Sequence, residues 1–143
     1  VSQPRRRAVV TPGYAGPLFA AAALPTPFAS PQEQVAGGLR IRLESDALRP
    51  RRESLLRFLL SDADSGLPVT DLEPYLGAAG HMLIVNSDLS SAIHGHPEAS
   101  RTSGHVVTFG SVFPAPGAYK LWVQFQRRGQ VVTVSFVVTI QEL

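Results

Sequence analysis

The chain has 143 residues, including 12 glycines, 12 prolines and no cysteine, and 44% of its residues are hydrophobic against 17% charged. This length indicates one domain with a tail, and the apolar fraction is sufficient for one packed core. The absence of cysteine excludes a disulfide scaffold, a cysteine-based zinc site and a thiol nucleophile, and a net charge of +2 is too small to indicate nucleic-acid binding.

Residues 1–38 are predicted to form an extended arm rich in proline, glycine and alanine. Six of the prolines lie in residues 1–31, and each one removes an amide donor and biases the preceding residue toward an extended conformation. The whole net charge also belongs to this arm, because residues 39–143 hold ten basic and ten acidic side chains. A secretory signal and a transmembrane span are alternatives, which the internal prolines and glycines disfavour.

The arm is predicted to dock the protein onto a partner. It carries apolar side chains on a segment that cannot form a core of its own, and the three arginines that precede them suit an acidic protein surface or lipid headgroups. An arm folded back onto its own domain is the alternative. The expected partner-binding residues are Arg5, Arg6, Arg7, Tyr14, Leu18, Phe19, Leu24 and Phe28.

Residues 39–143 are predicted to form the folded domain, because hydrophobic residues recur there with the period of two that strands with one buried face produce. The first run, Leu39, Ile41 and Leu43, alternates with charged side chains, whereas residues 55–60 are apolar on both parities. Strands are expected in the segments 39–44, 55–60, 82–85, 105–113, 119–126 and 132–140.

The connections between these segments carry turn residues. Residues 62–66 (DADSG) are expected to form a turn capped by its own side chains, since they lack the later carboxylate ligands of an EF-hand calcium loop. Residues 127–130 (RRGQ) are expected to form a hairpin in which Gly129 takes a positive φ. About seven short strands and no convincing helix predict an all-β fold, an antiparallel immunoglobulin-like sandwich with an extended N-terminal arm.

No motif in the sequence predicts catalysis. A G-x-S-x-G nucleophile elbow, an H-E-x-x-H zinc motif, a P-loop and a dinucleotide-binding fingerprint are all absent. Serine, histidine and aspartate occur, but nothing in the sequence places them at a common site. We therefore expect a protein that is not an enzyme.

A cluster of histidines is the strongest candidate for a metal site. His81, His94 and His96 fall within 16 residues, and histidines at positions i and i+2 of a strand point to the same side. A two-residue hairpin turn at residues 87–88 would place His81 opposite His94. That arrangement would assemble three imidazoles beside the Met82 thioether, a ligand mixture that suits copper. A structural cluster that hydrogen-bonds neighbouring backbone is the alternative.

Two clusters of arginines lie outside the arm, one formed by Arg49, Arg51 and Arg52 and the other by residues 127–128. Acidic residues balance the charge of the body and no aromatic signature of RNA binding is present, so nucleic acid is not an expected partner. Both clusters are expected to be solvated turns, with contact to an acidic partner or a lipid surface as the alternative.

Three segments in this order carry a family resemblance: residues 71–82 (DLEPYLGAAGHM), 94–97 (HGHP) and 113–126 (FPAPGAYKLWVQFQ). Over about residues 39–140 the chain resembles a group of bacterial extracytoplasmic immunoglobulin-like β-sandwich domains that are often found beside copper-handling and electron-transfer proteins. The histidines that recur in this family correspond to His81 and His96. The resemblance implies a periplasmic or other extracytoplasmic, membrane-associated location.

The sequence therefore predicts a non-enzymatic extracytoplasmic accessory subunit that docks through its arm onto a larger membrane or envelope protein complex. The alternative is a periplasmic module that binds or delivers copper, or another transition metal, through His81, Met82, His94 and His96. The first prediction depends on the arm and the second on the histidine cluster, so the two concern different parts of the chain.

Overall fold

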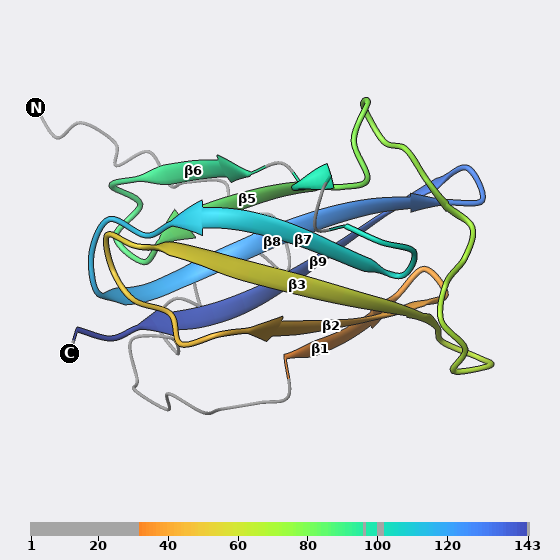
Figure 1. The fold of residues 1–143 in the computed structure, drawn as a ribbon, viewed down its shortest axis with the longest axis horizontal. Coiled ribbons are helices and arrows are strands. Elements are labelled where there is room, and N and C mark those ends of the chain that lie inside the picture. Colours follow the sequence, from red (N-terminus) through yellow and green to blue (C-terminus); the bar gives the residue numbers. More distant parts are fainter. Residues whose placement is uncertain (1–31, 96, 100–101, 143) are drawn as a thin grey trace, which may run out of the picture.

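The computed structural model describes residues 32–95, 97–99 and 102–142. This part of the chain is all-β, and its strands form two antiparallel sheets that pack face to face (Figure 1). The strands are β1 (Glu33–Ala36), β2 (Leu39–Ser45), β3 (Glu53–Asp62), β4 (Leu72–Glu73), β5 (His81–Asn86), β6 (Ala92–Gly95), β7 (Val106–Val112), β8 (Gly117–Arg127) and β9 (Gln130–Ile140). The predicted all-β antiparallel sandwich is confirmed, with the short strands β1, β4 and β6 in addition to the predicted ones.

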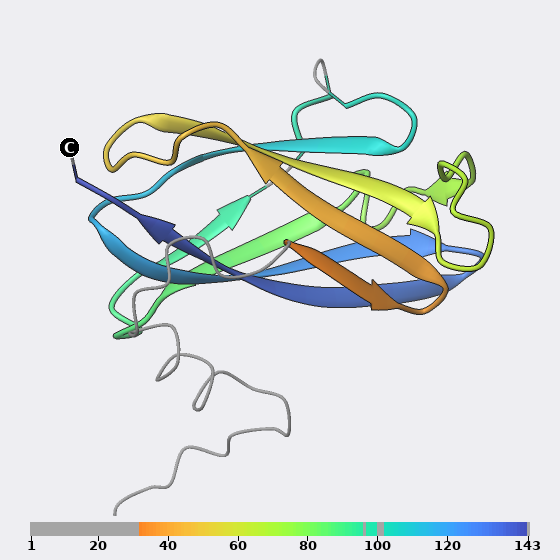
Figure 2. The same ribbon diagram turned by 90° about the horizontal axis from the view of Figure 1, so that it is seen from below.

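In each sheet a long strand has partners on both sides: β3 lies between β2 and β7 in the first sheet, and β8 lies between β9 and β5 in the second. The first sheet has the order β1-β2-β3-β7. In the second, β8 pairs with β9 along its whole length at one edge, and with β5 and then β4 at the other. β6 pairs with β5 at the end of that sheet. Figure 2 shows the sheets as two layers, with β2, β3 and β7 over β5, β8 and β9.

The folded domain begins before the predicted boundary at residue 39. Residues 33–36, which were predicted to belong to the arm, form β1 and pair with β2. Gly37 and Gly38 connect the two strands with φ values of 54° and 77°. Glycine adopts such values without steric cost, and two of them in sequence make the tight turn of a hairpin. These glycines therefore close a β-hairpin, although the sequence predicted that they belong to the extended arm.

Aromatic rings from both sheets meet at the centre of the core. Phe58 of β3 contacts Phe109 on the neighbouring β7, with 5.5 Å between the ring centroids. It also contacts Phe125 and Phe136 of the opposite sheet, at 6.0 and 5.7 Å. All four rings are at most 3% exposed. Aromatic pairs of this kind stabilise a core beyond the burial of their area, so this group couples the two sheets.

Tyr119 fixes the connection between β7 and β8. Its buried ring packs edge-on against Phe113, with 4.9 Å between centroids. Its hydroxyl donates to the carbonyl oxygen of Ala115 at 2.7 Å and accepts from the Ala115 amide at 3.2 Å. Because the buried hydroxyl both donates and accepts, the hydroxyl and the amide and carbonyl groups of Ala115 all have hydrogen-bond partners. The connection at residues 113–116 is thus tied to the strand that follows it.

A charged network joins the two sheets where β3 and β8 end. Arg127, whose side chain is 10% exposed, donates to Asp62 at 2.8 Å and to Asp71 at 2.7 Å. Asp62 also accepts the amides of Asp64 and Ser65 at 3.0 and 2.9 Å, which confirms the predicted self-capped turn. The Ser65 amide and the Arg127 guanidinium hold the pKa of the Asp62 carboxyl well below its usual value of 3.8.

Replacing Phe58 with alanine is expected to lower the free energy of unfolding by about 3–5 kcal/mol, because it removes a buried ring and leaves a cavity between the sheets. Urea unfolding followed by far-UV circular dichroism measures the change. Leu67→Ala is the control, since Leu67 is 66% exposed and its truncation is expected to change the stability by less than about 0.5 kcal/mol. Equal losses in the two variants would contradict the assignment of the core.

Asp62 is expected to make the stability depend on pH. Because its pKa is lowered in the folded state from 3.8, the stabilisation is complete above that value and is lost as the pH falls below it. Asp62→Asn is expected to lower the melting temperature at neutral pH and to flatten its decline on acidification. Asp64→Asn, a change at an exposed position of the same turn, should leave the profile intact. An unchanged profile for Asp62→Asn would refute this role.

Candidate metal centre

Two of the predicted ligands, His81 and His94, lie together on the outer face of the second sheet. His81 begins β5, and His94 lies on β6, which pairs with β5. Their ring centroids are 6.2 Å apart and the ring planes are tilted by 47°. A bond between a metal ion and an imidazole nitrogen measures about 2.0–2.1 Å. The two rings are therefore close enough to share one ion.

The strand pairing that brings the rings together differs from the predicted one. A two-residue turn at residues 87–88 would place His81 directly opposite His94, but His94 pairs with Leu83. The prediction was wrong because the turn is longer: the Asn86 side chain closes it with hydrogen bonds to two serines, at 2.7 and 3.0 Å. The register is shifted by two residues. An even shift keeps side chains on the same face of the sheet, so the predicted proximity survives.

A hydrogen bond orients the ring of His81. Its Nε2 atom lies 2.7 Å from the carbonyl oxygen of Tyr75, and a ring nitrogen must carry a proton to bond a carbonyl. In the neutral ring, Nδ1 then carries the lone pair. Histidines that bind metals commonly donate their other ring nitrogen to a backbone carbonyl in this way, which fixes the tautomer and the ring orientation. The Tyr75 ring also packs edge-on against the imidazole, with 5.4 Å between centroids.

The local sequence explains why this carbonyl reaches the ring. Residues 75–78 form a tight turn whose ends are joined by backbone hydrogen bonds of 2.7 and 3.1 Å. Gly80 then lies against β8, where a Cβ atom would be 2.9 Å from the carbonyl oxygen of Gln124. Since real Cβ atoms do not approach backbone so closely, the close approach requires glycine. β5 can thus begin beside β8 at His81.

The two histidines border a shallow pocket of about 390 Å³. Leu83 and Trp122, which pair across β5 and β8, contribute apolar surface. Gln124 and Thr133 contribute polar surface, and the Gln124 amide donates to the Thr133 hydroxyl at 3.1 Å. The pocket is lined by His81, Met82, Leu83, His94, Trp122, Gln124 and Thr133. Sequence reasoning missed Trp122 as a site residue, although its outward parity on β8 was the signal that could have found it.

Lys120 precedes Trp122 by two residues in β8 and therefore lies on the same face of the strand. Strand alternation predicts an outward side chain, yet Lys120 is buried. Its Nζ atom lies over the Trp122 ring, 4.8 Å from the centroid. An indole ring attracts a cation over its face, and burial lowers the pKa of the ammonium group.

Met82 does not join the histidines. The residue is 1% exposed and belongs to the hydrophobic core, so it borders the pocket from beneath. Neighbouring residues of a strand point to opposite faces of the sheet, so the residue after His81 cannot share its face. This alternation places the thioether away from the imidazoles.

His96, the fourth predicted ligand, lies outside the described residues. Within residues 32–95, 97–99 and 102–142, no group of three or more histidine, aspartate or glutamate side chains is arranged to hold a metal ion. The structure therefore brings together two of the four predicted ligands, His81 and His94.

The predicted docking arm also lies outside the described residues. This applies to all of its expected anchors, namely Arg5, Arg6, Arg7, Tyr14, Leu18, Phe19, Leu24 and Phe28. Docking onto a membrane or envelope complex stays a prediction. In the part of the chain that is described, no helix has the length and apolar character needed to cross a membrane.

Comparisons with known proteins give a family and a fold. The family model described as a domain of unknown function, DUF8832, matches residues 33–142, and its first matched residue is also the first residue of β1. No protein in the curated set matches the sequence.

Two solved structures share the fold. A DUF4426 family protein from Pseudomonas aeruginosa PAO1 is similar with a TM-score of 0.57 and 13% identity, over 76% of this chain and 96% of that one. A copper-bound variant of FetP from uropathogenic Escherichia coli strain F11 is similar with a TM-score of 0.53 and 10% identity, over 78% of this chain and 95% of that one. At these identities the likeness concerns the fold.

Proposed function

This chain belongs to the DUF8832 family of domains of unknown function, and we propose that it binds a transition metal, copper in particular, on the outer face of its second sheet. The observation that carries the proposal is the pair of imidazoles, His81 and His94, with 6.2 Å between their ring centroids. The FetP variant, which has a similar fold at 10% identity, is copper-bound. That likeness supports copper as the first metal to test.

The donor set fits copper in kind. Imidazole nitrogen is a good ligand for copper and zinc, and two imidazoles lie within reach of one ion. The Met82 thioether faces the core, so the proposed centre uses nitrogen donors. His96 is the proposed third ligand, because its spacing of two from His94 in the sequence suits residues on one side of an extended strand.

The surrounding groups have distinct roles in this proposal. The Tyr75 carbonyl holds the tautomer of His81 whose Nδ1 carries the lone pair, so His81 would bind the ion through Nδ1. Leu83 and Trp122 place apolar surface beside the rings, which limits access of water to a bound metal. Bound copper would be held for storage or transfer, in an extracytoplasmic protein as the family resemblance implies.

The chain's single tryptophan gives a direct readout of binding. Trp122 lines the same pocket as the histidines, and a bound Cu(II) ion quenches the fluorescence of a nearby indole. Titration of the full chain with Cu(II) is expected to quench Trp122 with a dissociation constant of about 1 μM or below. His81→Ala and His94→Ala are each expected to weaken binding by about tenfold or more.

His105→Ala is the matched control, because His105 precedes β7 of the other sheet and does not line the pocket. This variant is expected to bind copper with native affinity, while His96→Ala tests the third ligand. Calorimetric titration with Zn(II) compares the two metals without relying on quenching. Native copper affinity in both the His81 and the His94 variants would refute the proposed centre.

A further inference from the structure

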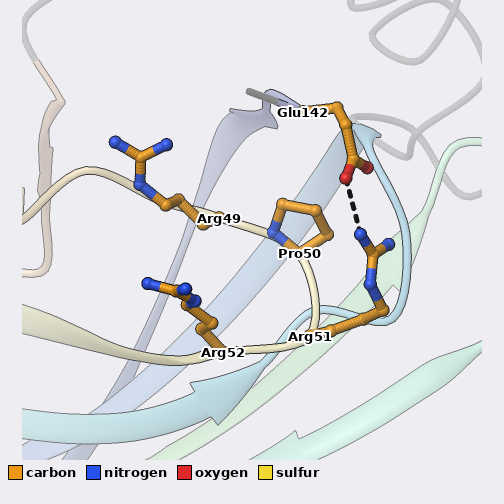
Figure 3. A pocket seen from close by; sticks show the side chains of 5 residues that line it. All are labelled: Arg49, Pro50, Arg51, Arg52 and Glu142. Atoms are coloured by element: carbon orange, nitrogen blue, oxygen red, sulfur yellow. Dashed lines mark hydrogen bonds and ion pairs between the residues drawn. The ribbon is translucent and has the colours of Figure 1, made fainter.

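A second pocket, at one end of the sandwich, is lined mainly by charged side chains (Figure 3). Its volume of about 380 Å³ lies at the lower end of the range for small-molecule sites. The connection between β2 and β3 and the segment after β9 form it, and it shares no lining residue with the histidine pocket. Its lining residues are Arg49, Pro50, Arg51, Arg52 and Glu142.

Contacts of Arg51 hold the turn that carries these arginines. The Arg51 amide donates to the carbonyl oxygen of Phe113 at 2.7 Å, and its guanidinium pairs with Glu142 at 2.5 Å. Arg51 has a positive φ of 61°, which is uncommon for a residue with a side chain and persists only where the surroundings enforce it. Pro50, which is buried, restricts the turn further.

Arg49 and Arg52 flank this turn. Figure 3 shows that both guanidinium groups extend to the same side of the turn, away from Glu142. Among the described residues, neither makes an ion pair. Glu142 neutralises one of the three arginines, so the pocket keeps an excess of two positive charges.

On the described strands next to the pocket, ion pairs balance the arginine charges. The arginines on the neighbouring strands have partners of their own: Arg42 pairs with Glu44 and Arg57 pairs with Asp46, both at 3.1 Å. A long acidic segment would therefore meet balanced charge on either side of the turn. The pattern favours a small anion that fits between two guanidinium groups.

We propose that Arg49 and Arg52 bind a phosphate-type oxyanion, either free phosphate or a phosphate ester. A guanidinium group recognises phosphate oxygens through two parallel hydrogen bonds, and two such groups balance a dianion. Arg51 is held in its ion pair with Glu142, so Arg49 and Arg52 are the pair that binds the ligand. This site is independent of the metal centre, since the two pockets have no residue in common.

Two experiments on the full chain distinguish soluble phosphate from a lipid headgroup as the source of the bound oxyanion. The first is calorimetric titration with inorganic phosphate, and the second is co-sedimentation with vesicles that contain phosphatidylglycerol. The chain is expected to bind phosphate, the vesicles, or both. Arg49→Gln and Arg52→Gln are each expected to weaken this binding by about tenfold or more. Arg42→Gln removes an exposed arginine elsewhere on the first sheet and is the matched control, expected to keep native affinity. Because Arg52 is exposed and Arg49 half-buried, these variants are expected to fold.

Glu142→Gln gives a test of opposite sign. It removes a carboxylate from the pocket and releases Arg51, so the affinity for phosphate is expected to rise. Three results would overturn the proposal: a dissociation constant weaker than about 10 mM for phosphate together with no vesicle binding, native affinity in the Arg49→Gln/Arg52→Gln double variant, or binding of polyglutamate in place of phosphate.

Discussion

β8 pairs with β5 along one edge and with β9 along the other. This pairing positions the Trp122 indole, the turn before β8 and the ion pair of Arg127. Pairing with β5 sets Trp122 beside Leu83, which places the indole next to the histidines. The first residues of β8 include Tyr119, whose hydroxyl anchors the preceding turn. The last residue of β8, Arg127, forms the ion pair with Asp62 that reaches the first sheet. One strand therefore contributes to the pocket lined by the histidines, to a corner of the sandwich and to the link between the sheets.

The two pockets are built by different means. The histidine pocket lies on paired strands, where backbone hydrogen bonds fix side-chain positions, and such positions are more precise than those on loops. The arginine pocket lies on connections, and its geometry depends on the ion pair between Arg51 and Glu142 and on the bond to Phe113. Side chains on paired strands suit a metal centre, because the distances from ligand to ion must be exact. Side chains on connections are sufficient for guanidinium groups that recognise an oxyanion.

Periodicity predicted the parts of this fold that depend on local sequence. Alternation identified the buried face of β8, and Gly129 takes the expected positive φ, here 73°. The assumed hairpin brought His81 and His94 to one face although its register was wrong, because the register is shifted by an even number of residues. Strand parity applied to Met82 would have excluded that ligand. The contact of Arg51 with Glu142 joins residues 91 positions apart. Only the three-dimensional arrangement of the sheets brings such residues together, so local patterns could not reveal it.

The position of His94 on β6 has a consequence for the edge of the second sheet. Within the described residues, β6 has four residues and its strand partner is β5, while just beyond it the Glu98 amide donates to the Thr108 carbonyl oxygen of β7 at 2.8 Å. An ion held by both His81 and His94 would cross-link this strand to its neighbour and stabilise the paired state by mass action. An unprotected sheet edge is a template for pairing with another chain. Occupancy of the proposed metal centre would thus affect how readily this edge opens.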